Sequence, residues 1–191
     1  MVILETQLYE QALVIRSQLG DEAAFAELLA LHGPRILRFT RQMMRMEPDK
    51  AEDVTQEIWV AIHRGLPALR EVDKFRSWAF RVARDRIHRE FRRRRVPLQV
   101  MDDLWIERIP ESQPELPEIE PEELQQALAR LSEEHREVLM LRFFEDMSYE
   151  DIAGVTHTAA GTVRSRLHYA KLALTRAFKI QSHEPSRNTI L

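Results

Sequence analysis

The sequence predicts an all-α protein made of two small helical domains joined by a flexible acidic linker. Only five glycines occur among 191 residues, while Leu, Ala, Glu and Arg, which all favour helix, are abundant. Apolar residues recur at helical spacing in two separate blocks of the chain. Between these blocks, five of the nine prolines stand in the stretch "VPLQVMDDLWIERIPESQPELPEIEP", where they exclude a regular helix.

The distribution of charge supports the same division. We expect a first domain over residues 1–96, the linker over 97–121, a second domain over 122–179 and a disordered tail over 180–191. The first domain carries 18 basic and 14 acidic side chains, whereas the linker carries one Arg and seven carboxylates, a balance that favours an extended chain. Residues 159–179 hold five basic side chains and no acidic one. The overall charge of −3 therefore conceals two basic surfaces, which points to a polyanionic partner.

Composition also excludes or disfavours several classes of function. No cysteine is present, which excludes disulfides and thiolate metal sites, and the seven histidines show no pair at the spacing of metal ligands on a helix. We therefore expect neither a metal nor another cofactor. No run of about 18 apolar residues occurs, and the N-terminal stretch lacks the basic start of a signal peptide, so we expect a cytoplasmic protein that inserts into no membrane. Without a Gly-rich phosphate loop or a nucleophile–base set, the protein is not expected to be an enzyme.

The first block begins with the stretch "GDEAAFAELLALHGPRILRFTRQMM", which we interpret as two helices, with Asp21 as the N-cap of the first. Another helix is expected to start at Pro48 and to end at Gly65 and Pro67. Its apolar residues fall at intervals of four, three and one, and are Val54, Ile58, Ala61 and Ile62. This spacing is typical of an amphipathic helix with one buried face.

The helix expected over residues 74–95 carries the strongest local signal. One stripe suits packing on neighbouring helices and consists of Phe80, Ala83, Ile87 and Phe91. A second stripe changes along its length from aromatic to cationic, and consists of Phe75, Trp78, Val82, Arg86, Arg89 and Arg93. Aromatic and Arg side chains together suit unstacked bases, while Arg alone suits phosphate. The alternative is that Phe75 and Trp78 belong to the hydrophobic core and that the arginines form a solvated helix end.

The second block shows a helix-turn-helix pattern. Two helices come first, one with an apolar face at Leu124, Leu128 and Leu131, the other over "EVLMLRFFE". Ser148 and Asp151 match a capping box at the start of the next helix. That helix is expected to turn Ile152, Ala153 and Val155 inward. The last helix has a packing stripe at intervals of four, three, four and four, consisting of Val163, Leu167, Ala170, Leu174 and Phe178. Because its opposite face is cationic, this pair of helices is typical of a DNA-binding motif.

The motifs in combination resemble the extracytoplasmic-function (ECF) sigma factors, the smallest promoter-specificity subunits of bacterial RNA polymerase. They are "EDVTQEIWVAIHRGL", "FRSWAFRVARD" and "LSEEHREVLMLRFFEDMSYEDIAGV" followed by "GTVRSRLHYAKLAL". The resemblance covers residues 21–96 and 122–179, about 70% of the chain. It implies a region-2 helical bundle, a linker and a region-4 helix-turn-helix domain. The implied partners are core RNA polymerase, promoter DNA and an anti-sigma factor.

The resemblance also implies roles for individual residues. Those expected to bind core RNA polymerase are Asp53, Gln56, Glu57 and Trp59. Those expected to capture the unstacked −10 element are Phe75, Trp78, Arg81, Arg84, Arg86, Arg89 and Arg93. Those expected to contact the −35 element as duplex DNA are Ala160, Gly161, Arg164, Ser165, Arg166, His168 and Lys171.

Within the −35 set, the side chains differ in what they can do. Arg164 and His168 are candidates for base edges, and Arg166 and Lys171 for phosphates, although Arg166 is also suited to pair with a carboxylate on a neighbouring helix. Small residues at the start of the helix allow its amides to approach the DNA backbone. The acidic linker is expected in the active-site and RNA-exit channel of the polymerase, although a solvated spacer is an equal alternative.

Two positions depart from the pattern of the family. Asp85 stands where many relatives have Asn, and a carboxylate facing DNA would be unfavourable, so Asp85 either points away or alters base preference. His157 stands where relatives usually have Gly, at a turn position expected to need a positive φ, which His tolerates at some cost.

Two other classes of protein remain open at this point. A free-standing helix-turn-helix regulator would carry a dimerisation or ligand-sensing domain in place of the first block. An adaptor that binds only protein would have no use for the basic run from Arg86 to Arg95. With no cysteine in the chain, any thiol sensor would have to reside in a partner.

Overall fold

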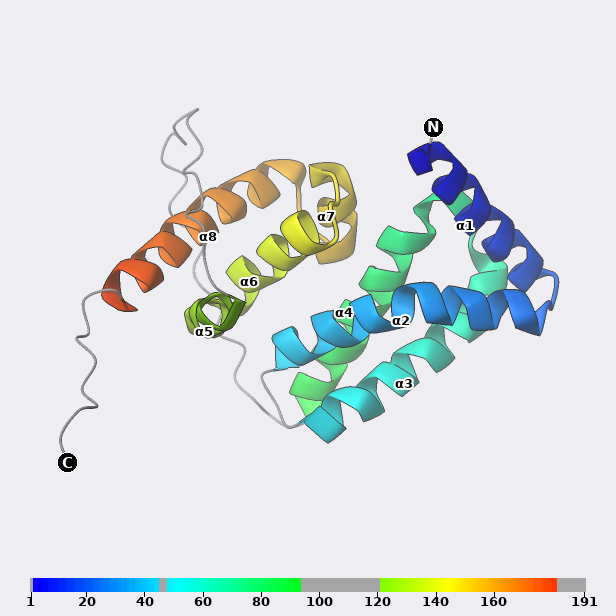
Figure 1. Cartoon of the computed structure of the whole chain (residues 1–191), viewed down its shortest axis with the longest axis horizontal. Helices are drawn as coiled ribbons and strands as arrows, with labels where there is room; N and C mark the ends of the chain where they lie inside the picture. The colour runs from blue at the N-terminus through cyan, green and yellow to red at the C-terminus, as the bar shows by residue number, and fades with distance from the viewer. Residues whose placement is uncertain (1, 45–47, 94–120, 182–191) are drawn as a thin grey trace. The chain divides into compact units, whose positions relative to one another are not determined.

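The computed structural model describes residues 2–44, 48–93 and 121–181, and every regular element within these ranges is a helix (Figure 1). The prediction of an all-α fold is therefore confirmed. The chain divides into two compact units, one built mainly on the helices before the linker and the other on the helices after it. The linker up to residue 120 and the tail from residue 182 lie outside the described ranges, so the expectations for both stay predictions.

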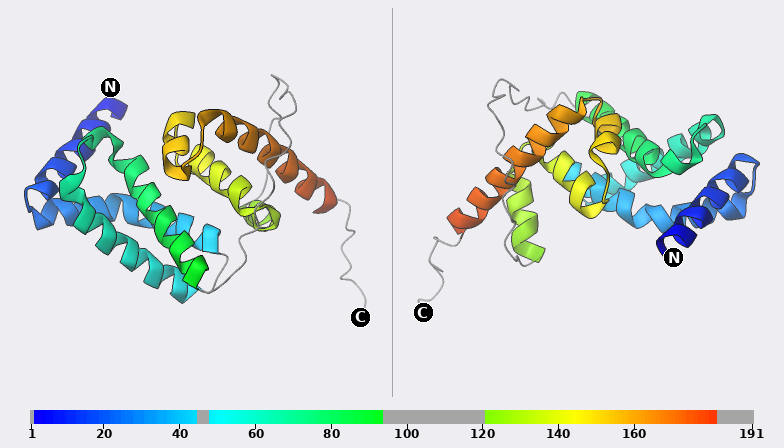
Figure 2. Two further views of the ribbon diagram at one scale, coloured as in Figure 1. Left: turned by 180° about the vertical axis from the view of Figure 1, so that it is seen from behind. Right: turned by 90° about the horizontal axis from the view of Figure 1, so that it is seen from above.

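In the first unit, helix α2 packs against α1, α3 and α4, and α4 also packs against α3 (Figures 1 and 2). The described elements of this unit are α1 (Val2–Gln18), α2 (Glu22–Met44), α3 (Pro48–Gly65), the short 3-10 helices η1 (Leu66–Ala68) and η2 (Val72–Lys74), and α4 (Phe75–Arg93). Helix α3 begins and ends where the sequence predicts.

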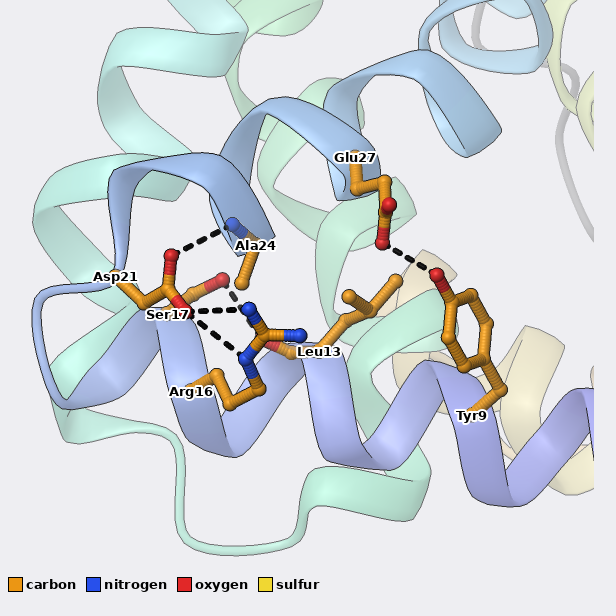
Figure 3. Close-up of polar contacts among 7 residues, drawn as sticks. All are labelled: Tyr9, Leu13, Arg16, Ser17, Asp21, Ala24 and Glu27. Carbon is orange, nitrogen blue, oxygen red and sulfur yellow. Dashed lines mark hydrogen bonds and ion pairs between the residues drawn. The ribbon is translucent and has the colours of Figure 1, made fainter.

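A hairpin of α1 and α2 opens the first unit, and Figure 3 shows its polar contacts. The chain turns at Gly20, whose φ of 90° suits glycine, and α2 then starts at a capped end. The Oδ1 atom of Asp21 accepts a hydrogen bond from the amide of Ala24 at 3.0 Å, which confirms Asp21 as the N-cap. Arg16 forms an ion pair with the same carboxylate at 2.6 Å. That hydrogen bond, followed by the pairing with Arg16, holds the pKa of Asp21 below its usual value.

Helix α2 corrects one prediction, because residues 22–44 form one helix rather than two. Pro34 lies inside the helix and cannot donate the usual hydrogen bond to the carbonyl four residues earlier. Pro34 is itself exposed, so water can reach the unpaired carbonyl. The buried stripe continues through this point and consists of Leu28, His32, Ile36, Phe39 and Met43. Burial of apolar side chains on both sides of Pro34 thus outweighs the local preference for a break.

The hydrophobic core of the first unit uses the stripes that the sequence indicates. On α4, the buried side chains include all four of the predicted stripe, Phe80, Ala83, Ile87 and Phe91. On α3, Val54, Ile58 and Ile62 are buried, while Ala61 is only half-buried. The rings of Phe39 and Phe80 meet edge to face, with centroids 5.3 Å apart. These contacts hold α4 against α2 and leave its arginines on the outer side.

The second unit consists of helices that pack mainly on the last one. Its described elements are α5 (Pro121–Arg130), α6 (Glu133–Leu139), the π-helical turn η3 (Met140–Phe144), α7 (Tyr149–Thr156) and α8 (Ala160–Gln181). Helix α8 packs against α5 and α6. Four of the five predicted packing residues on α8 are buried, namely Val163, Leu167, Ala170 and Leu174, while the side chain of Phe178 lies outside the described set. Helix α8 extends to Gln181, two residues beyond the predicted domain end.

Candidate functional site

On α3, three polar side chains share one exposed face. Asp53, Gln56 and Glu57 are spaced by three and one residues, and all three are exposed. Trp59 behaves differently, because only 7% of it is exposed and its ring meets that of Phe25 edge to face at 5.9 Å. Trp59 therefore anchors α3 against α2 and offers little surface to a partner, so its burial does not support the expectation of a direct contact, which stays a prediction.

Helix α4 presents the basic surface of the first unit. Arg89 and Arg93 are exposed, and the other three predicted arginines, at positions 81, 84 and 86, are half-buried. Arg93 forms an ion pair with the buried carboxylate of Glu90 at 2.9 Å, and this hydrogen bond raises the pKa of Arg93. Asp85 is exposed on the same helix, and one of its oxygens lies 3.9 Å from the Nη1 atom of Arg84. Asp85 thus places one carboxylate within the basic surface.

The two aromatic residues at the start of α4 have different environments. Phe75 is fully buried, and its ring meets that of His32 edge to face at 5.3 Å. Phe75 is therefore a residue of the hydrophobic core, and its burial favours the alternative reading over the prediction that it stacks on a base. Trp78 is half-buried, and its ring is tilted by 43° to the ring of Phe75 at a centroid distance of 6.2 Å. Trp78 retains the partly open aromatic surface that stacking requires.

Two contacts around Trp78 involve residues that the sequence did not single out. A Cβ atom placed on Gly65 would lie 2.9 Å from the Cζ2 atom of Trp78. The side-chain amide of Gln18 donates hydrogen bonds to the carbonyl oxygens of Leu66 at 3.0 Å and Leu69 at 2.7 Å. The only sequence signal for these contacts is the glycine at the end of a helix. Glycine is common at helix ends for reasons of backbone conformation, so this signal did not point to Trp78.

In the second unit, α7 and α8 form the expected helix-turn-helix. The Ser148 hydroxyl oxygen accepts a hydrogen bond from the Asp151 amide at 3.0 Å and donates to the Asp151 carboxylate at 2.7 Å, so the predicted cap is confirmed. Ile152 and Val155 are buried as predicted, and Ala153 is half-buried. His157 has a φ of 55°, which confirms the prediction of a left-handed residue at the turn.

The face of α8 beyond its packing stripe carries the predicted DNA-binding residues. Gly161 and Arg164 are exposed, and Ala160, Ser165, Arg166 and His168 are half-buried. A Cβ atom on Gly161 would meet no atom within 4 Å, so the start of the helix is open to a close approach. The ring of His168 meets that of Tyr169 edge to face at 5.3 Å. Arg164 thus has the freest side chain of the set.

Lys171 has an environment that does not favour the predicted contact with DNA. Only 9% of it is exposed, and its ammonium lies 5.1 Å from the centre of the Phe143 ring. The π-helical turn η3 brings Phe143 to this place, since it shifts the register after α6 and buries Met140 and Leu141 instead. The sequence could not show this contact, because a lysine on a cationic face looks the same whether it points to DNA or folds back.

Comparisons with known proteins cover both units. A model of sigma-70 region 2 matches residues 28–96, and a model of sigma-70 region 4 matches residues 121–174. The chain is 34% identical over 187 residues to the RNA polymerase sigma-H factor of Pseudomonas aeruginosa, covering 91% of this chain and 96% of the relative. It is 30% identical over 184 residues to the ECF RNA polymerase sigma-E factor of Escherichia coli, covering 90% of this chain and 95% of the relative.

A solved structure is also similar. It is the sigma factor RpoE of Bartonella quintana in complex with the anti-sigma factor NepR, with a TM-score of 0.65 and 26% identity, covering 82% of this chain and 97% of that one. The two matched domains define a sigma subunit of bacterial RNA polymerase. Within that class, the chain belongs to the ECF sigma factors.

Membership of this family sets the function. The protein binds core RNA polymerase and directs promoter-specific initiation, and a free-standing regulator is not favoured because region 2 is present. Sigma factors act as regulatory subunits of the polymerase. Over the described residues, no helix is long and apolar enough to cross a membrane.

Proposed function

We propose that the exposed face of α3 is the contact with core RNA polymerase, and that Asp53, Gln56 and Glu57 make it. Two carboxylates and an amide on one face of a rigid helix suit a basic or hydrogen-bonding helix on the partner. The observation that supports this best is the exposure of all three side chains on a helix whose opposite face is fully packed. Trp59 supports the contact from behind by fixing α3 in place.

The −10 element is held by α4 in this proposal. Trp78 provides the stacking surface, Arg89 and Arg93 contact phosphates, and the half-buried arginines at 81, 84 and 86 line the path of the strand. A strand whose bases are unstacked requires an aromatic surface beside cations, and α4 offers the half-buried Trp78 together with these five arginines. Asp85 lies beside Arg84 and lowers the net positive charge along this path.

The −35 element is read by α8. Arg164 is the first candidate for a base edge, since it is exposed one turn beyond the open start of the helix. His168 lies one turn further along the same face with Ser165 beside it, whereas Arg166, which is half-buried, lies on another side of the helix. Lys171 is left out of the DNA contacts, because its ammonium lies over Phe143. The backbone amides at Ala160 and Gly161 complete the contact with phosphate.

A partner that restrains the protein is also part of the proposal. The similar RpoE of Bartonella quintana was solved with the anti-sigma factor NepR. We infer that an anti-sigma factor binds this chain in the cytoplasm, where core RNA polymerase works, and that the chain has no catalytic activity of its own. Purification from its native cells should yield a fraction free of polymerase in which a second protein blocks binding to core RNA polymerase.

Run-off transcription tests the proposal as a whole. Core RNA polymerase, the full-length chain and a genomic promoter library should give transcripts from a small set of promoters that share two elements. Alanine variants of Asp53 and Gln56 should weaken binding to core RNA polymerase, whereas Arg164→Ala should not. If the chain fails to bind core RNA polymerase at moderate salt, the assignment of α3 is overturned.

A further inference from the structure

Gly65 occupies a place where the backbone does not require glycine. Its φ of −87° and ψ of −20° are open to any residue, so conformational freedom does not explain its presence. Helix propensity does not explain the glycine either, because alanine is the better helix former, by about 1 kcal/mol in a helix interior. What excludes a side chain is the indole of Trp78, whose Cζ2 and Cη2 atoms would lie 2.9 and 3.4 Å from a Cβ atom.

The position of Trp78 is therefore set from two sides. The backbone of Gly65 bounds the indole at the end of α3, and the buried ring of Phe75 lies 6.2 Å away. Trp78 is half-buried, so part of its ring stays open to solvent between these limits. A methyl group at Gly65 would meet the indole itself, at its Cζ2 and Cη2 atoms, so the indole would have to shift.

Gln18 secures the turn that follows Gly65. Its side-chain amide bonds both ends of η1, at the carbonyl oxygens of Leu66 and Leu69, from the last turn of α1. Both acceptors lie in a segment that leaves α3 and approaches α4, where few backbone hydrogen bonds exist. Helix α1 lies ahead of the region-2 match, which starts at residue 28, yet its Gln18 side chain bonds the turn that joins α3 to α4.

We propose that Gly65 and Gln18 are positioning residues for promoter opening: Gly65 leaves the space in which the Trp78 indole stands, and Gln18 fixes the turn that directly follows Gly65. This inference rests on the proposed role of Trp78 as the stacking surface for the −10 element. It predicts that both residues affect base capture through Trp78 alone, and leave the binding of core RNA polymerase intact.

The test uses the full-length chain in holoenzyme on a promoter with a fluorescent base analogue in the −10 element. The variants are Gly65→Ala, Gln18→Met and Trp78→Ala, with Gly33→Ala as the matched control. A Cβ atom at Gly33 meets only Leu29 at 3.8 Å, an ordinary contact within the same unit. Gln18→Met keeps the size of the side chain and removes both donors, so it serves if Gly65→Ala fails to fold.

The rate of promoter opening by the Gly65→Ala holoenzyme should fall about tenfold, as expected for the loss of one base-stacking contact. The Gln18→Met holoenzyme should show a smaller fall in the same rate. Gly33→Ala should match the wild type. Affinity for core RNA polymerase should stay unchanged in all of them. The double variant Gly65→Ala with Trp78→Ala should open promoters no more slowly than Trp78→Ala alone, because both changes remove the same contact.

A second readout reports the indole directly. With 5-fluorotryptophan in the chain, the three tryptophans give three fluorine resonances, and Trp78→Phe identifies one of them. Gly65→Ala should move the Trp78 resonance and leave the other two in place. A merely structural role would alter the resonance of the buried Trp59 and the melting temperature as well.

The outcomes separate the two proposals. If Trp78→Ala opens promoters slowly while Gly65→Ala and Gln18→Met behave as the wild type, the positioning role is overturned and the role of Trp78 stands. If Trp78→Ala opens promoters normally, the stacking role is overturned, and the inference falls with it. If the effects of Gly65→Ala and Trp78→Ala multiply in the double variant, Gly65 acts by another route and the inference is wrong.

Discussion

Glu57 on α3 and Arg86 on α4 form an ion pair, so a residue proposed to face the polymerase binds a residue proposed to face DNA. The side chains are 51% and 26% exposed, respectively. Ion pairs at this level of exposure contribute about 0–1 kcal/mol to stability because water and salt screen them. The pair therefore serves to orient Arg86 more than to hold the fold together.

Glu57→Gln tests whether the Glu57–Arg86 pair contributes little to stability. Urea unfolding should show a loss of no more than about 1 kcal/mol, while affinity for core RNA polymerase should fall by a larger free energy. Glu52→Gln is the matched control, because Glu52 lies on the same helix as Glu57, forms an exposed pair with Arg41 of α2 and has no proposed role at the polymerase. Equal effects of the two variants on polymerase affinity would contradict a specific role for Glu57.

Arg164→Ala should weaken binding to the −35 element by about 1–3 kcal/mol and relax base preference at one position, as the loss of a bidentate base contact would. We expect this effect because the Arg164 side chain is exposed on α8 and can reach a base edge. Transcription from promoters substituted at each −35 position measures both effects. A uniform loss across all sequences would instead identify Arg164 as a phosphate contact.

Lys171→Gln should leave the salt dependence of −35 binding unchanged. Each lost phosphate contact lowers the slope of log K against log salt by about 0.9, but the ammonium of Lys171 lies over Phe143 and is not available. Stability should fall instead, by about 0.5–2 kcal/mol for a cation–π contact. Arg176→Gln, an exposed cation on the same helix, serves as a control for the general charge of α8. A lower salt slope for Lys171→Gln would show that the lysine reaches DNA.

His157→Gly should raise the free energy of unfolding by up to about 1 kcal/mol. Relief of the left-handed conformation should stabilise the fold by about 1–2 kcal/mol. The greater entropy of glycine in the unfolded chain should offset about 0.5–1 kcal/mol of this gain. Thr158→Gly is the control at the next position, where φ is not positive, and it should destabilise the protein. Denaturant unfolding of both variants gives the comparison. A less stable His157→Gly would mean that the imidazole makes contacts that outweigh the strain.

Asp21→Asn should reduce the pH dependence of stability in acid. The pKa of Asp21 is lower in the folded protein than in the unfolded chain, so its charge stabilises the fold above the unfolded pKa of about 4. That contribution is lost as the pH falls through the lower, folded pKa. Asn retains the ability to cap α2 but carries no charge. The difference in melting temperature between wild type and variant should therefore be largest near pH 6 and should shrink toward pH 2; a difference independent of pH would contradict the assignment.

Hydrophobic periodicity and local capping and turn motifs predicted the features that depend on a single helix or turn. The buried stripes of α3, α4 and α8, the caps at Asp21 and Ser148, and the left-handed His157 could all be predicted, because each reflects local backbone chemistry or one face of a helix. Helix α1 could not, since its exposed positions include apolar residues, among them Leu8 and Ile15, and no clear face emerges.

Contacts between distant residues account for the rest. Phe75 and Trp78 occupy neighbouring places on one stripe, and only the packing of α2 against α4 decides that Phe75 is buried and Trp78 is not. The fusion of the two helices predicted around Pro34 depends on burial along the whole of α2. Gly65 lies against Trp78, and Gln18 bonds Leu66 and Leu69. These contacts join separate elements, so the hydrophobic periodicity of a single helix cannot predict them.

The hydrogen bonds of Gln18 with Leu66 and Leu69 also bear on the order in which the first domain assembles. They join positions 48 and 51 residues apart, whereas α1 with α2 and α2 with α3 are neighbours along the chain. Local pairs can associate early during synthesis, and the distant closure comes later. A nascent chain that has completed the α1–α2 hairpin would thus still lack the surface proposed to hold the −10 element, and would acquire it only once the turn after α3 and helix α4 have both left the ribosome.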